Sequence, residues 1–207
     1  MTHSRQGNAR PRTWSSRARF ALRVLCVGLA LICAAVPVQA QEVVVPEALQ
    51  AEFIAKLLAY DRNFRARAGG RVEVLLISKR GSDRSSANVA EVRFALERRD
   101  QIGGLPHREV VAHYEGAAAL AARCRAQRIS VVYLGVELGS EITAIRKALE
   151  GVDVLTVSAV SSYVPEGAVL GFDLVSGKPK IWVNLTQAKK QKVDFKSDAL
   201  RVMKVYR

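Results

Sequence analysis

Aliphatic runs and helical segments alternate along the middle of this chain. The runs lie at 71–78, 108–114, 129–134 and 152–157, and helical patterns at 88–99, 117–127 and 140–150 separate them. A nearly continuous aliphatic run, such as the first, is typical of a strand buried on both faces. Strands that alternate with helices at this spacing form right-handed βαβ units. The sequence therefore predicts an α/β fold with three layers, in which helices cover both faces of a mostly parallel, Rossmann-like sheet.

One long helix is expected before the first strand. Pro46 opens it, and Gly69 and Gly70 end it, which gives a helix of about twenty residues. Its apolar residues recur every three or four positions, as on one face of a helix. They are Leu49, Phe53, Leu57, Tyr60 and Phe64.

A hairpin and a final helix are expected after the fourth strand. Residues 168–174 and 180–184 have the pattern of two strands, and Ser176–Lys178 form the turn between them. We expect this hairpin to form an antiparallel edge of the sheet. The last segment, Ser197–Tyr206, is expected to be a C-terminal helix that docks through Leu200, Met203 and Val205.

The first forty residues have the pattern of a secretory signal peptide. Six arginines and no acid precede an apolar run at 24–36, and Val38-Gln39-Ala40 follows as a cleavage pattern that ends in a small residue. The run is shorter than the roughly 20 residues that a membrane span needs. We therefore expect cleavage near Ala40, a periplasmic location, and a single α/β domain at 41–207. The alternatives are an uncleaved N-terminal anchor and a lipoprotein that begins at Cys33.

Charge and cysteine content limit the partners. The chain has a net charge of +13, but the six arginines of residues 1–40 contribute to it, and the remainder has +7. No helix-turn-helix, zinc-finger or aromatic RNA-binding motif is present, so nucleic acid is not an expected partner. An anionic lipid, an anionic polymer or an acidic protein fits better. Cys124 is the only cysteine after Ala40. It is interpreted as a small, half-buried apolar residue, with an intermolecular disulfide or a redox-sensitive thiol as the alternative.

An ordered series of residues runs through the C-terminal quarter. It comprises Val154–Val157, Tyr163, Gly167, the hairpin, Val183–Leu185, Ala188, Phe195, Ser197 and Leu200–Val205. Their order and spacing resemble the end of the YfiR/HmsC family of small periplasmic proteins, and residues 48–151 match that family more loosely. Two features depart from it. Tyr60–Phe64 stands where the family usually has an aromatic–proline pair, and the lone Cys124 cannot form the disulfides that help to hold better-known members.

Candidate contact residues lie in loops after the first and fourth strands. In open α/β sheets, ligands bind beyond the carboxyl ends of the strands. The candidate residues at this rim are Lys79, Arg80, Ser82, Ser161, Ser162, Tyr163 and Glu166. The first three, with Gly81 and Ser85, are suited to an anion at a helix N-terminus, although no P-loop or dinucleotide motif is present. A solvated loop and a turn capped by its own hydroxyls are the alternatives.

A second candidate is the basic segment near the C-terminus. Lys189, Lys190 and Lys192 would contact an acidic partner or anionic headgroups, and a solvated edge is the alternative. Trp182 is expected in the core of its strand, with an interface anchor as the alternative.

Catalytic and metal-binding patterns are not found. His107 and His113 would lie at the two ends of one strand, about 20 Å apart, which is too far for one metal ion. A Gly-x-Ser-x-Gly elbow is absent. The sequence therefore predicts no cofactor, no metal and no enzyme activity.

The resemblance implies a regulatory protein. It implies binding to the periplasmic part of an inner-membrane sensor, specifically a diguanylate cyclase that is held inactive, and hence control of cyclic-di-GMP and biofilm. It also implies an outer-membrane lipoprotein as antagonist and a homodimer. A second hypothesis, from the βα alternation, is a solute-binding module equivalent to one lobe of a transporter-associated binding protein. An envelope enzyme is a third hypothesis.

Overall fold

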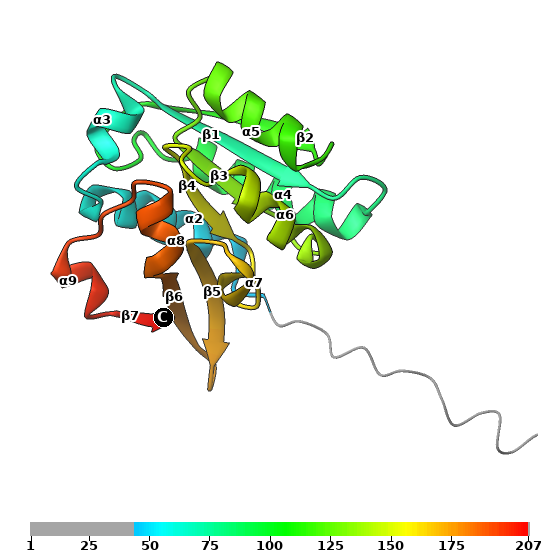
Figure 1. Cartoon of the computed structure of the whole chain (residues 1–207). Helices are drawn as coiled ribbons and strands as arrows, with labels where there is room; N and C mark the ends of the chain where they lie inside the picture. Colours follow the sequence, from blue (N-terminus) through cyan, green and yellow to red (C-terminus); the bar gives the residue numbers. More distant parts are fainter. Residues whose placement is uncertain (1–43, 207) are drawn as a thin grey trace, which may run out of the picture. The chain divides into compact units, whose positions relative to one another are not determined.

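The computed structural model describes residues 44–206, which form one seven-stranded sheet with helices on both faces (Figure 1). The strand order is β2-β1-β3-β4-β5-β6-β7. The strands are β1 (Val72–Ser78), β2 (His107–His113), β3 (Val131–Leu134), β4 (Leu155–Ser158), β5 (Leu170–Val175), β6 (Lys178–Asn184) and β7 (Met203–Tyr206). Neighbouring strands from β2 to β5 are parallel, β5 and β6 are antiparallel, and β7 runs parallel to β6. The predicted α/β class and mostly parallel sheet are confirmed.

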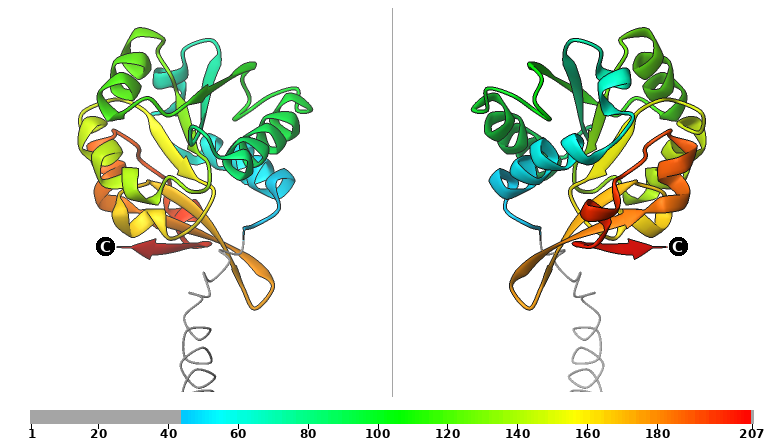
Figure 2. Two further views of the ribbon diagram at one scale, coloured as in Figure 1. Left: turned by 90° about the vertical axis from the view of Figure 1, so that its right-hand side faces the viewer. Right: turned by 90° about the vertical axis from the view of Figure 1, so that its left-hand side faces the viewer.

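The longer helices lie in two layers. They are α2 (Glu47–Leu57), α4 (Asp83–Glu97), α5 (Ala117–Ala126) and α6 (Ile142–Ala148). Helices α2 and α4 pack together on one face of the sheet, and α5 and α6 pack together on the other (Figure 2). The shorter helices are η1 (Leu58–Tyr60), α3 (Phe64–Ala68), η2 (Gly139–Glu141), α7 (Tyr163–Glu166), α8 (Leu185–Lys190) and α9 (Ser197–Leu200).

The burial of the strands follows from these two layers. All residues of β1, β3 and β4 are buried, as expected for aliphatic strands covered on both sides. Strand β2 lies at the end of the sheet and is only half-buried. Tyr133 in β3 is the largest fully buried side chain, and its hydroxyl donates a hydrogen bond to Gln50 Oε1 at 2.9 Å. This bond satisfies the one polar group that the tyrosine brings into the core.

The predicted single helix from Pro46 to Gly69 is wrong. Helix α2 ends at Leu57, η1 adds one turn, and α3 begins only at Phe64. Between them, Asp61 has extended backbone angles and forms an isolated antiparallel bridge with Phe195. Tyr60, which the periodicity placed on the apolar face, is 42% exposed. A contact with the distant C-terminal segment therefore overrides the local helical pattern.

The predicted C-terminal helix is also wrong beyond its first turn. Helix α9 ends at Leu200, and Met203–Tyr206 form strand β7, which pairs with β6. The hairpin of β5 and β6 forms as predicted, with positive φ at Ser176 and Gly177 in its turn. Because β7 lies outside β6, the hairpin is next to the edge of the sheet and does not form the edge itself.

Two helix starts differ from the prediction by a few residues. Helix α4 begins at Asp83, before the predicted Asn88, because Ser82 caps it. Helix α6 begins at Ile142, after the 3-10 turn that contains Ser140. The predicted signal peptide at 1–40 lies outside the described residues. Within residues 44–206, no helix combines the length and apolar character that a membrane crossing requires.

Candidate functional site

The loop after β1 is fixed by contacts within the chain. The hydroxyl of Ser82 accepts a hydrogen bond from the backbone N–H of Ser85 at 3.0 Å and donates one to the carboxylate of Glu137. Arg84 lies 3.7 Å from the same carboxylate. Arg80 forms an exposed ion pair with Glu115 at 3.0 Å. A carboxylate of the chain itself thus lies at the N-terminus of α4, where the sequence suggested an anionic ligand.

The crevice between β1 and β3 is filled by side chains. The strand order reverses here, and α/β proteins commonly bind ligands at such a point. The hydroxyl of Ser85 donates to the carbonyl of Val136 at 2.8 Å, and Asn88 Oδ1 accepts from the N–H of the same residue at 3.3 Å. A Cβ added to Gly135 would lie 2.9 Å from Val89 Cγ2. The rim is therefore closely packed at this point, and its exposed side chains remain a predicted contact surface.

The second group of rim residues belongs to the segment of α7. Tyr163 is buried, and its hydroxyl oxygen accepts a hydrogen bond from the N–H of Leu138 at 2.7 Å. Ser162 and Glu166 are exposed, and Ser161 is half-buried. Glu137 contacts Ser82 while its neighbour Leu138 contacts Tyr163, so one loop connects both groups of rim residues.

The basic segment forms several internal contacts. Lys190 pairs with Glu150 at 2.8 Å, and this hydrogen bond lowers the pKa of the Glu150 carboxyl. The backbone carbonyl of Lys192 accepts hydrogen bonds from Asn63 and Arg67. Lys189 is exposed. Of the three predicted lysines, Lys190 is therefore held in an ion pair.

Trp182 lies in β6, and the two histidines lie in β2. Trp182 is half-buried, and the ammonium of Lys204 lies 3.9 Å from its ring centroid. His107 contacts Glu109 and the carbonyl of Arg99, and His113 Nδ1 lies 2.9 Å from Ser78 Oγ. The two histidines stand at opposite ends of β2, as predicted. Across the described part of the chain, no three His, Cys, Asp or Glu residues gather in a metal-binding arrangement.

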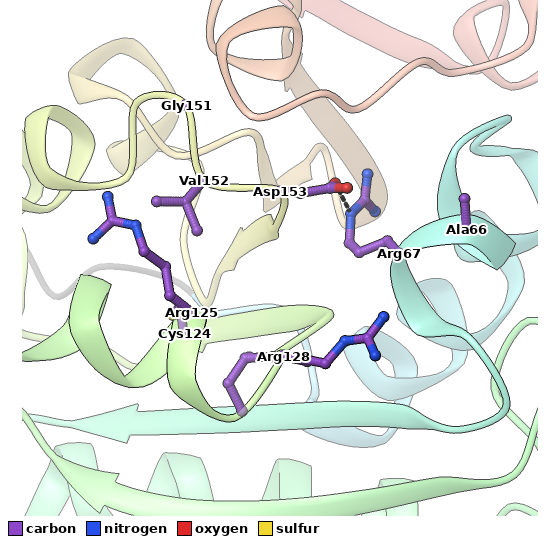
Figure 3. Close-up of a pocket in the computed structure, with 9 residues that line it drawn as sticks. Ala66, Arg67, Cys124, Arg125, Arg128, Gly151, Val152 and Asp153 are labelled. Atoms are coloured by element: carbon purple, nitrogen blue, oxygen red, sulfur yellow. Dashed lines mark hydrogen bonds and ion pairs between the residues drawn. The ribbon is translucent and has the colours of Figure 1, made fainter.

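The sequence did not indicate a further pocket, which lies at the amino ends of β3 and β4, opposite the rim at their carboxyl ends (Figure 3). Its volume is about 340 Å³. The lining residues are Ala66, Arg67, Cys124, Arg125, Arg128, Ile129, Gly151, Val152 and Asp153. They come from three separate segments, and the topological rule for ligand sites in α/β sheets points to the carboxyl ends of strands, not to this end. No local motif could have identified this pocket.

Arg67 forms a buried ionic network at one wall of this pocket. Its NH1 group lies 2.7 Å from Asp61 Oδ2, and its Nε lies 2.7 Å from Asp153 Oδ1. The side chains of Arg67 and Asp61 are 2% and 0% exposed. Two carboxylates therefore neutralise this buried guanidinium, as the desolvation of a charge requires.

Cys124 forms part of the floor of the pocket but is only 2% exposed. Burial raises the pKa of its thiol to about 12. Since the thiolate is the reactive form, this cysteine is chemically protected. The structure supports the interpretation of a small buried apolar residue over that of an intermolecular disulfide.

Iodoacetamide is expected to alkylate Cys124 at least ~100-fold more slowly in the native protein than in urea at pH 8, because burial suppresses the thiolate. Well below pH 9 the thiol is largely neutral in both states, and stability hardly depends on it. Above that pH the unfolded chain loses the proton first, so stability falls as the pH rises towards 12. Mass spectrometry over time gives the rates. Equal rates in the native and denatured protein would contradict the buried thiol.

An apolar groove lies between α4 and β2. It has a volume of about 420 Å³ and is lined by Ser78, Ser86, Ala90, Arg93, Phe94, Glu97, Val111 and His113. Phe94 is 57% exposed and Val111 is 41% exposed. A second depression of about 450 Å³ also borders Phe94 and is lined by Ala48, Glu91, Ala95, Arg98 and Arg99. We call these surfaces together the α4–β2 groove. No sequence motif indicated this surface.

The α/β fold is shared with solved structures of other proteins. An ABC domain in complex with L-Trp from Streptococcus pneumonia has a TM-score of 0.56 and 12% identity, and the alignment covers 78% of this chain and 60% of that one. A conserved domain protein from Vibrio cholerae has a TM-score of 0.50 and 17% identity, with 81% and 62% covered. The chain thus spans about three fifths of these solved structures, and the likeness shows the fold alone. No curated protein matches the sequence.

The family follows from the sequence of the described domain. The YfiR/HmsC-like family model matches residues 47–204, and the chain belongs to this family. The predicted resemblance is confirmed over most of the domain, beyond the C-terminal quarter on which it rested. Membership supports a regulatory, non-catalytic role in the periplasm.

Proposed function

We propose that this protein is a periplasmic regulator that binds the periplasmic part of an inner-membrane sensor and holds that sensor inactive. The proposed sensor is a diguanylate cyclase, so that binding lowers cyclic-di-GMP and biofilm formation. Membership of the YfiR/HmsC-like family supports the regulatory role. The observation that carries the binding mechanism is the α4–β2 groove, with its 57% exposed Phe94.

The groove has the composition of a protein interface. A protruding aromatic residue with arginines around it is the usual pattern of a binding hot spot. The guanidinium of Arg98 lies 5.6 Å from the ring centroid of Phe94, and Val111 adds apolar surface from β2. Single exposed apolar residues are common, but an aromatic residue between two depressions offers a partner both a ridge and two hollows.

The edge of β2 adds backbone donors and acceptors to this surface. The carbonyl of Pro106 and the N–H of Tyr114 bond to β1, so even-numbered residues of β2 point their backbone groups towards β1. The odd-numbered residues, including Val111, point theirs outward, and no other strand of the described domain pairs with them. A partner strand can therefore add to the sheet beside Phe94.

Charge favours an acidic partner. Arg93 pairs with Glu97, and Arg98 and Arg99 line the second depression together with Glu91, so that arginines outnumber carboxylates on this surface. The predicted rim residues Lys79 and Arg80 directly follow Ser78, which lines one end of the groove. We include both in the proposed interface and expect association to weaken as salt concentration rises. Ser161, Ser162 and Glu166 remain candidate contacts, and Lys189, Lys190 and Lys192 a separate one.

The regulation is a binding equilibrium. A repressor that prefers the inactive state of a sensor shifts its population by the difference between its affinities for the two states. An outer-membrane lipoprotein that competes for the same surface would release the sensor. A homodimer through β2 would compete in the same way.

Phe94→Glu is expected to weaken binding to the purified periplasmic domain of the sensor by at least about 30-fold, equivalent to about 2 kcal/mol, because it removes the aromatic anchor. Calorimetric titration measures the affinity. In cells that carry the variant, cyclic-di-GMP and biofilm should rise towards the levels of the gene deletion.

Val202→Glu is the matched control, since Val202 is 67% exposed and lies beside β7, away from the groove. It should bind as the wild type does. Binding that is unchanged in Phe94→Glu would overturn the proposed interface. Cyclic-di-GMP that does not change on deletion of the gene would overturn the proposed function.

A solute-binding module is the second candidate. The neighbour solved with L-Trp has the same α/β architecture over 78% of this chain, and this supports the candidate at the level of fold. A transporter permease encoded beside the gene would favour it, whereas a neighbouring diguanylate cyclase with a periplasmic region would favour the regulator.

A further inference from the structure

We propose that the pocket beside Arg67 binds a small soluble molecule that carries phosphate or carboxylate groups, and that Arg125 and Arg128 bind such groups from the two sides of the pocket mouth. The pocket lies at the amino ends of β3 and β4 and shares no lining residue with the α4–β2 groove. The proposal therefore does not depend on the proposed interface. It adds a ligand site at a place that neither of the two functions proposed above uses.

The charges of the pocket are not balanced. Asp153 is the only carboxylate among the lining residues, and it pairs with Arg67 at 2.7 Å. Asp61 pairs with the same arginine. Arg125 and Arg128 are exposed, and neither forms a side-chain hydrogen bond or ion pair within residues 44–206. Two guanidinium groups thus lack an anion, and guanidinium binds phosphate and carboxylate through paired hydrogen bonds.

The backbone at Arg128 supports a role for this side chain. Arg128 has φ of +51° and follows Gln127, the C-cap of α5, at a position where glycine is usual. The N–H of Ile129 bonds the carbonyl of Cys124 at 3.0 Å, and the N–H of Arg128 bonds that of Arg125 at 3.4 Å, as in a Schellman motif. The turn needs no arginine, so an arginine here points to a use for the guanidinium.

The close-up shows how the side chains lie. Arg128 extends from the end of α5 towards Ala66 and Arg67, and Arg125 extends towards Gly151 and Val152 (Figure 3). The two guanidinium groups therefore reach opposite sides of the pocket mouth. The last carbonyls of α5 are bonded to backbone N–H groups of the turn, which reduces their repulsion of an anion.

The rest of the lining suits a small organic body. Ile129, Val152 and Ala66 provide apolar surface, and the buried thiol of Cys124 adds to it. A Cβ at Gly151 would meet no atom within 4 Å, so the wall is open there. A volume of about 340 Å³ holds an anionic group together with a few carbon atoms.

The alternative role of these arginines is stabilisation of the α5 dipole. Cations near a helix C-terminus interact favourably with its carbonyls. That role would make stability depend on the arginines without any dependence on added anions. Anion binding and its loss in selected variants therefore separate the two roles.

The test titrates the exported protein with inorganic phosphate, sulfate and citrate, and ¹H–¹⁵N NMR follows the amides of Ile129 and Gly151. At least one anion should shift these amides in a saturable way. Arg128→Gly, which suits the backbone at this position, should stay folded and bind at least 10-fold more weakly. Arg125→Gln should have a similar effect.

Arg123→Gln is the control. Arg123 lies on the same helix, its removal changes the charge equally, and it lines a different depression beside Glu115. This variant should bind as the wild type does. Equal weakening in Arg123→Gln, unchanged binding in Arg128→Gly, or the absence of saturable shifts would overturn the proposal. Shifts with phosphatidylglycerol vesicles alone would assign the arginines to a lipid surface and would also overturn it.

Discussion

Asp61→Ala is expected to lower the free energy of unfolding by about 3–5 kcal/mol, because it leaves the buried charge of Arg67 with one of its two carboxylates. A folded domain has a total stability of only about 5–15 kcal/mol, so this loss should be plain in urea denaturation at pH 7. The side chains of both residues are almost completely inaccessible, and water cannot replace the missing carboxylate.

The effect is expected to be large because Asp61 connects segments that are distant in the sequence. Its Oδ1 atom accepts hydrogen bonds from the N–H groups of Asn63 at 3.1 Å and Asp194 at 3.0 Å. Its Oδ2 atom binds Arg67. One carboxylate therefore holds the start of α3, the C-terminal segment and the buried guanidinium together.

The controls separate burial from charge. Arg62→Ala removes an exposed ion pair with Asp194, whose members are 52% and 55% exposed, and should cost less than about 1 kcal/mol. Asp61→Leu combined with Arg67→Met should cost less than Asp61→Ala alone, because no buried charge remains unpaired and Asp153, which loses its partner, is 42% exposed. A loss below about 1 kcal/mol in Asp61→Ala would show that the network contributes little.

The same network explains why the first helix could not be predicted correctly. Leu57, Tyr60 and Phe64 continue a helical apolar pattern, and no glycine or proline interrupts it. The helix ends because Asp61 pairs with Phe195, more than a hundred residues later. A local pattern contains no information about such a partner.

The parallel strands were predictable for the opposite reason. In β1, β3 and β4 every residue is buried, so a continuous aliphatic run is enough to predict a strand that is covered on both faces. Met203 and Val205 illustrate the limit, since they fit a helical face and also the alternation of β7. For so short a segment, only the neighbouring β6 decides between the two.

The candidate sites were predictable only where a rule of topology applied. Residues such as Ser82 and Tyr163 could be placed near the carboxyl ends of the strands from their order alone. Their contacts with Glu137 and Leu138 could not be predicted, because β3 lies between β1 and β4 only in the folded sheet. Arg128 carried no sequence signal at all, since its importance arises from its positive φ and from the pocket around it.

Tyr163→Ala is expected to lower the free energy of unfolding by about 3–5 kcal/mol, as truncation of a buried aromatic ring usually does. Tyr163→Phe should cost about 1–3 kcal/mol, because the N–H of Leu138 then loses its buried acceptor at 2.7 Å. Both values come from urea denaturation. This order of effects assigns Tyr163 a structural role in positioning the loop after β3.

Two comparisons distinguish that role from direct contact with a partner. Ser162→Ala changes an exposed neighbour and should alter stability by less than about 0.5 kcal/mol. If Tyr163 contacted the partner, Tyr163→Phe would abolish binding and leave stability unchanged. If Tyr163 is structural, Tyr163→Phe lowers stability and does not abolish binding. The structure favours this result, because Tyr163 is 4% exposed and its hydroxyl already bonds Leu138. Partner affinity and urea midpoint, measured on the same preparations, therefore decide whether Tyr163 belongs to the interface or supports the loop beneath it.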